Sequence, residues 1–540
     1  MKTKQRWLLK GTVTLVLAAI AGCYSYKEPA AATMGESYTQ RQKDQSDDML
    51  KDVGVLSLRD AQRIAIKNNP TYISAYHSVE AARLKYLQAW GAYSPTVTAG
   101  FDMGYSLDWV ARYRRKDYPS YDSDHPRNNT FSTNTGIQAN MLLFDGFARL
   151  FRLKAAKSGF DYQARLEEDA CRTMMQAVAY AYNTVLLAKE NRRIAQTDKE
   201  FQLSSLENTR HKFNAGAAPL SDVLNFEIYV KSAEVSLINA DYQYEVAIYA
   251  LAQLMGYPEG TLPANVKFPE KYSTEFAELP AVEIYLDAAL ANRPDLKAYR
   301  EQLNIANYQV YQAWGAYSPT VNGYVNWNYS TGDVDGYSTD YRHRRTDNMN
   351  FGFGIAADYV IFNGAIRLNQ LREAKAARAV AEYQVAAQWF KVVSEVRNAY
   401  ANYVQNVKKT RMLGEVKKLS EQQRNLVKEE YEAGKAELTR LNEAQRDLVE
   451  AETSLASSYI NVQNAKAQLI AVVGGATADY YLTNDGKNEK VPGLDGVNSA
   501  LEAAAASKNG QTEPVQAPAV TRPAAPSAAP AIPASATVKK

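Results

Sequence analysis

The chain has 540 residues and a nearly balanced charge, with 62 Lys and Arg against 59 Asp and Glu and a formal net charge of +3. Because nucleic-acid binding needs a basic surface, this balance gives no reason to expect it. The four histidines are scattered, and we find no phosphate-binding glycine loop, nucleophile elbow or recognisable carboxylate pair. We therefore predict no metal, no cofactor and no enzymatic activity.

Residues 1–22 have the pattern of a secretory signal peptide, in which basic residues precede a short apolar run. The run is shorter than the ~20 residues of a transmembrane helix. Its end, Ile20-Ala21-Gly22-Cys23, resembles a bacterial lipobox, in which the cysteine is acylated and becomes the mature N-terminus. We predict a covalent lipid on Cys23 and a lipid-anchored segment at 23–54, the alternative being an ordinary cleavage site beside a chance cysteine. Removing the signal takes away four positive charges and lowers the net charge from +3 to −1.

A repeated decapeptide defines the organisation of the chain. Gln-Ala-Trp-Gly-Ala-Tyr-Ser-Pro-Thr-Val occurs at Gln88–Val97 and again at Gln312–Val321, an offset of 224 residues. Downstream, the tetrapeptide at 143–146 (Leu-Phe-Asp-Gly) matches that at 361–364 (Ile-Phe-Asn-Gly) at an offset of 218. Since a match of ten residues is not a chance event, the chain consists of two copies of one unit.

The two copies set the predicted domain boundaries. We expect a first repeat at 55–257, a linker rich in proline at 258–280 and a second repeat at 281–475. Residues 476–540 form a C-terminal segment whose Ala/Pro-rich tail is expected to be disordered. The offset changes only between the decapeptide and the tetrapeptide, which indicates a loop of different length there.

Four segments alternate between apolar and polar residues, which indicates strands with one apolar and one polar face. They cover 97–109 and 131–143 in the first copy, and 321–329 and 351–361 in the second, with polar loops at about 111–130 and 331–348. Such strands suit a soluble sandwich, and they are also long enough for tilted membrane strands of ~9–11 residues. An open sheet edge is not tolerated in lipid, so four membrane strands would require several chains to share one barrel.

Helices of unusual length flank these strands. A helix is predicted to begin near Pro70 and near Pro294 and to end before each decapeptide proline. After the strands, Asp145 and Asn363 are predicted N-caps of helices that run to Gly216 and Gly434, a length approaching ~100 Å. Second helices return over about 221–255 and 438–472. The order in each copy is thus helix, strand, strand, long helix, helix.

Apolar residues repeat along both long helices at spacings of three and four, which indicates a narrow packing seam. The predicted seam residues are Met175, Val178, Tyr182 and Val185 in the first copy, and Val393, Val396, Tyr400, Tyr403 and Val407 in the second.

These elements together resemble the outer-membrane efflux protein family, the TolC-like channels, and within it the lipoproteins of the OprM type. The resemblance covers about residues 55–475. It depends on the motifs at 92–97 (Ala-Tyr-Ser-Pro-Thr-Val) and 143–146, and on the turn at 213–216 (Phe-Asn-Ala-Gly) with Ser-Asp-Val-Leu at 221–224 after it. Each motif has its counterpart in the second copy. It implies a mainly α fold with membrane β-strands, in which a homotrimer forms a 12-stranded barrel and a periplasmic α-helical barrel. It also implies a periplasmic adaptor and an inner-membrane transporter as partners.

The resemblance further implies an entrance at the two turns around Gly216 and Gly434, which would also contact the adaptor. Asp222 and Arg440 each lie six residues after one of these glycines. With Tyr431 and Glu443 they are the candidate gate residues, and the alternative is that the two charges merely decorate helix surfaces. The family often has an acidic residue where this chain has Arg440.

Three functions fit this sequence. The first is a passive channel of a tripartite efflux pump in the outer membrane, the second a channel for type I protein secretion, and the third a lipid-anchored coiled-coil protein of the envelope. The alternating strands favour a channel, because an envelope spacer has no need of a lipid-facing sheet. For a channel, the apolar strand parity (Phe101, Phe353) should face outer-membrane lipid and the polar parity (Asn134, Asn326) should line water.

Overall fold

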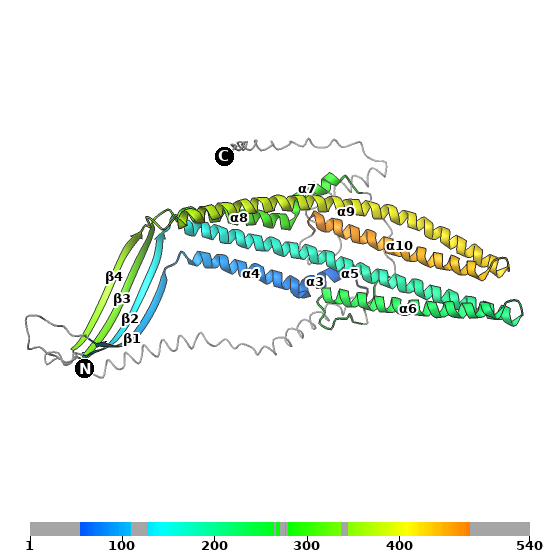
Figure 1. Cartoon of the computed structure of the whole chain (residues 1–540), viewed down its shortest axis with the longest axis horizontal. Helices are drawn as coiled ribbons and strands as arrows, with labels where there is room; N and C mark the ends of the chain where they lie inside the picture. Colours follow the sequence, from blue (N-terminus) through cyan, green and yellow to red (C-terminus); the bar gives the residue numbers. More distant parts are fainter. Residues whose placement is uncertain are drawn as a thin grey trace, which may run out of the picture.

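The computed structural model describes residues 54–109, 127–263, 266–269, 276, 279–335 and 344–475. A four-stranded sheet forms one end of this elongated structure, and long, nearly parallel helices extend away from it to two helical hairpin tips (Figure 1). The predicted signal peptide, Cys23 and the C-terminal tail lie outside the described residues.

Each half of the chain contains the same six elements in the same order. The first half comprises α3 (Leu58–Asn68), α4 (Pro70–Gly91), β1 (Thr96–Trp109), β2 (Arg127–Phe144), α5 (Ala148–Asn214) and α6 (Leu220–Leu254). The second comprises α7 (Val282–Asn292), α8 (Pro294–Gly315), β3 (Thr320–Asp335), β4 (Arg344–Asp358), α9 (Ile366–Glu432) and α10 (Leu438–Val473). The predicted order is confirmed, with one addition: each half begins with a short helix, α3 or α7.

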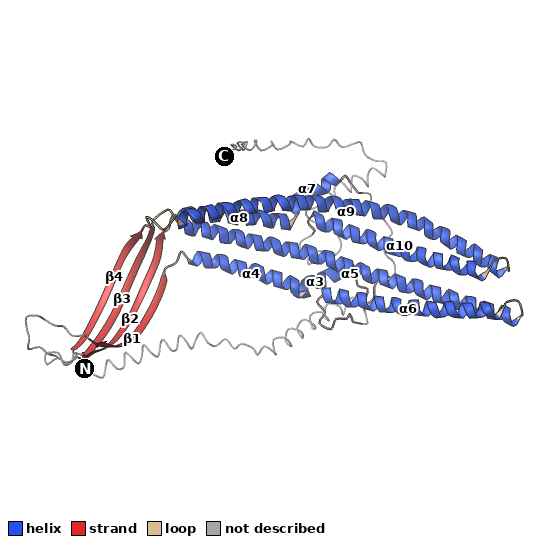
Figure 2. Ribbon diagram, viewed as in Figure 1, coloured by secondary structure: helices blue, strands red, loops and turns tan. Residues whose placement is uncertain are grey.

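The four strands form one antiparallel sheet in the order β1-β2-β3-β4 (Figure 2). The two hairpins have the same register, since Thr96 pairs with Asn140 and Thr320, at the equivalent position, pairs with Asp358. β2, β3 and β4 extend further into the predicted loops than their polar residues indicated, because backbone hydrogen bonds continue the ladder whatever the side chain. β4 is shorter than predicted at its other end: Asp358 already faces the first residue of β3, so residues 359–361 have no strand opposite them.

The long helices α5 and α9 have 67 residues each, which corresponds to ~100 Å at 1.5 Å per residue. The first predicted seam is confirmed, because Met175, Val178, Tyr182 and Val185 are all buried. The second seam is wrong at two positions: Val392 and Ala399 are fully buried, whereas the predicted Val393 and Tyr400 are only half-buried. The buried set, Val392, Val396, Ala399, Tyr403 and Val407, keeps the three-and-four spacing in a slightly different phase.

The predicted caps of the long helices are also corrected. The N-cap positions of α5 and α9 are Phe147 and Ala365, both in the left-handed region with φ of 65° and 63°. The Asp145 carboxylate still reaches the first turn of α5, accepting a hydrogen bond from the backbone N–H of Arg149 at 2.7 Å. Asn363 contacts the first turn of α9 through its backbone carbonyl, which accepts from the N–H of Ile366 at 3.3 Å. Two successive residues with positive φ turn the chain sharply from strand to helix. The first residue of each pair is a glycine, which adopts this conformation readily because it has no Cβ.

Equivalent contacts hold the middle of each half together. The Asn69 side chain donates to the Leu254 carbonyl at 2.8 Å and thereby ties the start of α4 to the end of α6. At the equivalent place in the second half, the Arg293 guanidinium donates to the Val472 carbonyl of α10 at 3.5 Å. A core of apolar side chains from α3, α5 and α6 packs beside the first contact, and one from α7, α9 and α10 packs beside the second.

Candidate functional site

The strand register brings most of the large apolar residues of all four strands onto one face of the sheet. Phe101 lies beside Thr135, Tyr329 and Met349 in successive strands, and Val97 lies beside Ala139, Val325 and Phe353. The large side chains on this face are solvent-exposed in the single chain, with Phe101 at 56% and Phe353 at 76% exposure. The sheet therefore presents a continuous apolar surface with no partner in the described structure.

The opposite face of the sheet carries mainly amides, hydroxyls and glycines, and it also includes the Asp102 carboxylate and the Tyr324 ring. Asp102 lies beside Asn134, Ser330 and Asn348, and the next polar row joins Gly100, Gly136, Asn328 and Asn350. Glycines leave room for some of these amides. A Cβ on Gly352, for example, would lie 2.7 Å from the Oδ1 atom of Asn326 on β3. Such a face suits contact with water and polar solutes.

The two hairpin tips, at the far end from the sheet, have the same turn geometry. Gly216 and Gly434 have φ of 74° and 73°, and their N–H groups donate to the carbonyls of Phe213 and Tyr431. A left-handed glycine at the end of a helix satisfies carbonyls of the last turn. Both glycines thus end the long helices as predicted.

One candidate gate residue, Tyr431, joins the two tips. The Lys212 ammonium of α5 lies 4.7 Å from the centre of the Tyr431 ring of α9, and the Phe226 ring of α6 lies 6.4 Å from it. Below this contact the four helices share a buried apolar cluster of Leu206, Val223, Phe226, Val230, Val427, Leu441 and Ala444. The tips of the single chain are therefore packed together by aromatic and cation–π contacts.

The other three candidates do not meet one another within the chain. Arg440 forms an ion pair with Glu430 of its own hairpin, with 3.2 Å between Nη1 and Oε2. Asp222 is half-buried and Glu443 is exposed, and neither side chain forms an ion pair in the part of the chain that the structure describes. Sequence reasoning missed Lys212 and Glu430. They occupy equivalent positions at the offset of 218, so the two tips carry the same pair of sites with the charges reversed, Lys212 and Asp222 against Glu430 and Arg440.

A buried charge network lies at mid-length in the second half, around Arg293. Arg293 is 2% exposed, and its guanidinium binds the Asp295 carboxylate through two contacts of 3.0 and 2.5 Å and Glu395 of α9 at 2.5 Å. Gln388 of α9 donates a further hydrogen bond to Asp295 at 2.7 Å. Burial alone would raise the pKa of the Asp295 carboxyl, but the hydrogen bond and charge of Arg293 outweigh burial, so the pKa lies below its ordinary value. The network braces α8 against α9 and α10.

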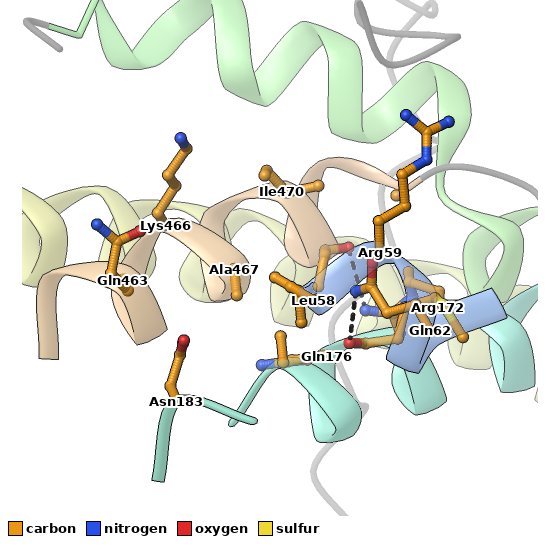
Figure 3. Close-up of a pocket in the computed structure, with 14 residues that line it drawn as sticks. Leu58, Arg59, Gln62, Arg172, Gln176, Asn183, Gln463, Lys466, Ala467 and Ile470 are labelled. Atoms are coloured by element: carbon orange, nitrogen blue, oxygen red, sulfur yellow. Dashed lines mark hydrogen bonds between the residues drawn. The ribbon is translucent and has the colours of Figure 1, made fainter. Parts of the chain in front are cut away.

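A pocket of about 330 Å³ lies between the two halves at this level (Figure 3). Its lining comes from α3, α5 and α10, and Arg172 extends across it from α5 to donate to the Ala471 carbonyl at 3.2 Å. Arg59 and Lys466 also line the pocket, while Asn183 of α5 donates to Asn464 of α10 at 2.8 Å beside it. The pocket marks the seam along which one repeat packs on the other.

Within the described ranges, no cluster of three or more His, Cys, Asp or Glu side chains is arranged to hold a metal ion. None of the helices in those ranges combines the length and apolar character needed to span a membrane.

Comparison with solved structures identifies the class of this fold. The chain superimposes on the membrane channel CusC with a TM-score of 0.64 at 16% identity, covering 78% of this chain and 92% of CusC. It matches the outer membrane protein VceC from Vibrio cholerae with a TM-score of 0.63 at 18% identity, covering 77% and 96% of the two chains. The CmeC outer membrane channel of Campylobacter jejuni gives a TM-score of 0.64 at 17% identity, covering 82% and 89%. The fold is that of the TolC-like outer-membrane channels.

Sequence comparison identifies the family. Residues 62–257 and 285–475 match the family model described as outer membrane efflux protein, and the chain belongs to this family. The alkaline protease secretion protein AprF of Pseudomonas aeruginosa is 23% identical over 356 residues, which cover 65% of this chain and 70% of AprF. The outer membrane protein TolC of Escherichia coli is 25% identical over 285 residues, which cover 51% of this chain and 55% of TolC.

Proposed function

We propose that the protein is the outer-membrane channel subunit of a tripartite efflux pump, a passive duct for small molecules. Three copies would place their sheets side by side in one closed barrel of twelve strands, with the helices continuing as a tunnel into the periplasm. The apolar sheet face would contact lipid, and the polar face would line the water-filled lumen.

The sheet is the observation that carries this proposal. Its apolar face spans all four strands in register, and β1 and β4 are its edges. An open edge in hydrocarbon leaves backbone N–H and C=O groups unsatisfied, at several kcal/mol each, so a lipid-embedded sheet of four strands has to be completed by other copies. A soluble sandwich would instead bury its apolar face under a second sheet, and no second sheet occurs among the described residues.

The helices supply the reach that such a duct needs. With 67 residues each, α5 and α9 extend ~100 Å from the sheet. The tips around Gly216 and Gly434 would then stand far from the outer membrane, where a periplasmic adaptor and an inner-membrane transporter could engage them. Asp222, Tyr431, Arg440 and Glu443 stay candidates for the gate at this entrance.

Cys23 is proposed as a lipid anchor in the outer membrane. The residue after it is tyrosine, whereas aspartate at that position favours retention in the inner membrane in the enterobacterial sorting scheme. A single acyl chain binds membranes reversibly, and two or more hold firmly. Mass spectrometry of the mature N-terminus tests this anchor: we expect an acylated peptide that begins at Cys23, and an unmodified peptide beginning elsewhere would refute it.

Protein secretion is a second candidate function, favoured by the likeness to AprF, whose name describes secretion of an alkaline protease. Deleting the gene from its host separates the two. An efflux channel predicts higher accumulation of small fluorescent dyes in the deletion strain and restoration by the wild-type gene. A secretion channel predicts unchanged dye accumulation and an exported protein retained in the cells. A deletion strain with neither defect would contradict both.

A further inference from the structure

We propose that a pocket between α8 and α9, close to the sheet, binds the phosphate headgroup of an anionic phospholipid. This inference rests on the proposed outer-membrane channel, in which the apolar face of the sheet contacts lipid. It adds to that channel a defined lipid site in the membrane leaflet that faces the periplasm.

The pocket has a volume of about 430 Å³ and combines aromatic rings with cations. Tyr311 and Trp314 of α8 line it together with Lys375 and Arg378 of α9. The Lys375 ammonium lies 5.6 Å from the centre of the Trp314 ring. The two aromatic side chains are still 52% and 50% exposed, so the pocket leaves them open to a ligand. Since α8 packs on α9 within one chain (Figure 1), a single chain supplies the whole lining.

Aromatic rings extend the pocket across α8 to α5. The Phe151 ring of α5 stacks on that of Tyr311, with 5.0 Å between the ring centres. Three residues further along α5, the Lys154 ammonium lies 5.7 Å from the centre of the Phe151 ring and 6.0 Å from that of the Tyr308 ring of α8. The cations on either side of these rings therefore belong to one surface that spans α5, α8 and α9.

Ring contacts connect this surface to the apolar face of the sheet. Phe144 of β2 lies opposite Val321 of β3, which shares its face with Val325 four residues later. The Phe144 ring contacts that of Phe147 with 5.7 Å between centres, and Phe151 follows one turn later on α5. Because Phe151 belongs to the surface with the cations, that surface lies on the side of the molecule that would face lipid.

The junction between β4 and α9 has a similar set of contacts. The Trp314 ring lies 5.6 Å from that of Tyr317, and the Arg367 guanidinium of α9 lies 5.4 Å from the centre of the Tyr317 ring. The same guanidinium lies 5.7 Å from the ring of Tyr359, the residue directly after β4. In the sequence, Tyr359 continues the alternation of apolar residues along β4. Both sets of contacts thus place the pocket at the periplasmic border of the apolar band.

The charge at this border is strongly positive. Residues 148–160 of α5 include four basic and no acidic residues, and residues 366–381 of α9 include four basic residues and one acidic residue. Lys154 and Lys375 form no ion pair with any residue that the structure describes, while Arg378 pairs with Glu382 at 2.9 Å. Basic residues beside a membrane attract anionic lipids, and basic pockets between helices hold their headgroups.

The combination of rings and cations favours a lipid over a free anion. Aromatic side chains are concentrated where a membrane barrel meets the headgroups, because an amphipathic ring suits that boundary. Lysine side chains beside them can lie along apolar surface and bring their ammonium groups to the phosphates. A free phosphate ion would use the cations alone, whereas a phospholipid would also contact the rings.

The first repeat offers a matched control for the pocket. Lys157 is the counterpart of Lys375 at the offset of 218, and it is exposed as well. The counterpart of Arg378, however, is Phe160, and Lys157 is not among the residues that line the pocket. Replacing either lysine by glutamine removes the same charge from the same part of a long helix, but only one replacement alters the pocket.

Lipid titration tests the site. The purified full-length protein in a neutral detergent is titrated with phosphatidylglycerol or with phosphatidylethanolamine, and native mass spectrometry measures the lipid bound. We expect tighter binding of phosphatidylglycerol, because its headgroup has a net negative charge. Lys375→Gln should weaken this binding about fivefold, the effect of losing one basic residue beside an anionic lipid, and Lys157→Gln should change it less than about twofold.

Three results would overturn the site. The first is equal binding of the two lipids by the wild-type protein. The second is an equal loss of phosphatidylglycerol binding in Lys375→Gln and Lys157→Gln, which would mean that general surface charge attracts the lipid. The third is displacement of phosphatidylglycerol by an equal concentration of inorganic phosphate, which would identify a site for free anions.

Conductance of the same preparations in planar bilayers separates this inference from the proposed function. A protein that conducts but has no preference for phosphatidylglycerol would overturn the lipid site and leave the channel standing. A protein that binds phosphatidylglycerol through Lys375 without conducting would confirm the lipid site and contradict the channel. A protein that does neither would overturn both.

Discussion

Arg293 holds three helices together, a role that its neighbours in the sequence do not indicate. It is the N-cap residue of α8, in the tripeptide Asn-Arg-Pro, and its counterpart in the first repeat is the neutral Asn69. Both side chains hold the end of a returning helix, but Arg293 also binds the carboxylates of Asp295 and Glu395. Removing a buried guanidinium that has two acidic partners strongly destabilises a protein, because the buried carboxylates are left without an opposite charge.

Replacing this residue should therefore destabilise the protein strongly. We expect Arg293→Ala to lower the free energy of unfolding by ~3–5 kcal/mol, the range for breaking a buried ion pair. Arg83→Ala is the control, because Arg83 pairs with Glu80 on the exposed face of α4 and solvent-exposed pairs of this kind contribute little to stability. The midpoints of denaturant unfolding, followed by helical circular dichroism in detergent, compare the two. Similar midpoints for both variants would mean that the network does not brace the helices.

Residue-level features also mark the limit of what the sequence could predict. The glycines that end α5 and α9 were predicted, because a glycine that follows a long helical pattern readily adopts the positive φ that ends a helix. The left-handed N-caps Phe147 and Ala365 were not, since neither residue type signals a positive φ. Arg293 could be recognised as a brace only once α8, α9 and α10 were placed around it, because two of its partners, Glu395 and the Val472 carbonyl, lie 102 and 179 residues away along the chain.

At the scale of elements, periodicity predicted most of the structure. Strict alternation identified all four strands and their apolar parity, and the three-and-four spacing of apolar residues identified the long helices. The short helices α3 and α7 were missed, although Ser57 and Asp60 form a capping box at the start of α3. The errors at Val393 and Tyr400 arose because each follows another apolar residue, Val392 or Ala399, and the three-and-four spacing alone does not decide which of two neighbours is buried. Polar residues at the ends of β2, β3 and β4 were assigned to loops, although their backbones continue the strand pairing.

The parity of the strands makes a testable distinction between the two faces of the sheet. Phe101→Arg would put a charge on the apolar face near the middle of β1, at a cost of ~2–4 kcal/mol if that face contacts lipid. Asn326→Arg, on the polar face of β3, should be far milder. We expect Phe101→Arg to reduce the amount of trimer recovered from outer membranes and Asn326→Arg to leave it near the wild-type amount. Equal recovery of both variants would refute the assignment of the faces.

The whole molecule combines two ends with different tasks. The sheet is open at both edges, whereas the tips are packed together by Tyr431, Lys212 and the apolar cluster beneath them. In a threefold assembly, Asp222 and Arg440 would occupy equivalent places in a ring at the entrance. Within each chain, Arg440 is held in place by its ion pair with Glu430 of the same hairpin.

Charge reversal at the entrance tests whether these residues hold it closed. Arg440→Asp removes the pair with Glu430 and leaves acidic side chains at both equivalent positions, so repulsion should loosen the entrance and raise the channel conductance. Arg446→Asp is the control, with the same charge change at an exposed site on the same helix, beside Asp447. Single exposed ion pairs contribute only ~0–1 kcal/mol, so the effect depends on threefold repetition. Conductance of the first variant equal to that of the control would exclude Arg440 from the gate.

The most direct test of the channel itself combines single-channel recording with chemical labelling. Purified protein in planar lipid bilayers should show discrete conductance steps. A charged thiol reagent should reduce the current through Asn326→Cys, whose side chain would line the lumen, and leave Phe353→Cys unchanged, whose side chain would face lipid. Absence of any conducting pore, or block of Phe353→Cys in place of Asn326→Cys, would contradict the proposal that the polar face of this sheet encloses a water-filled duct.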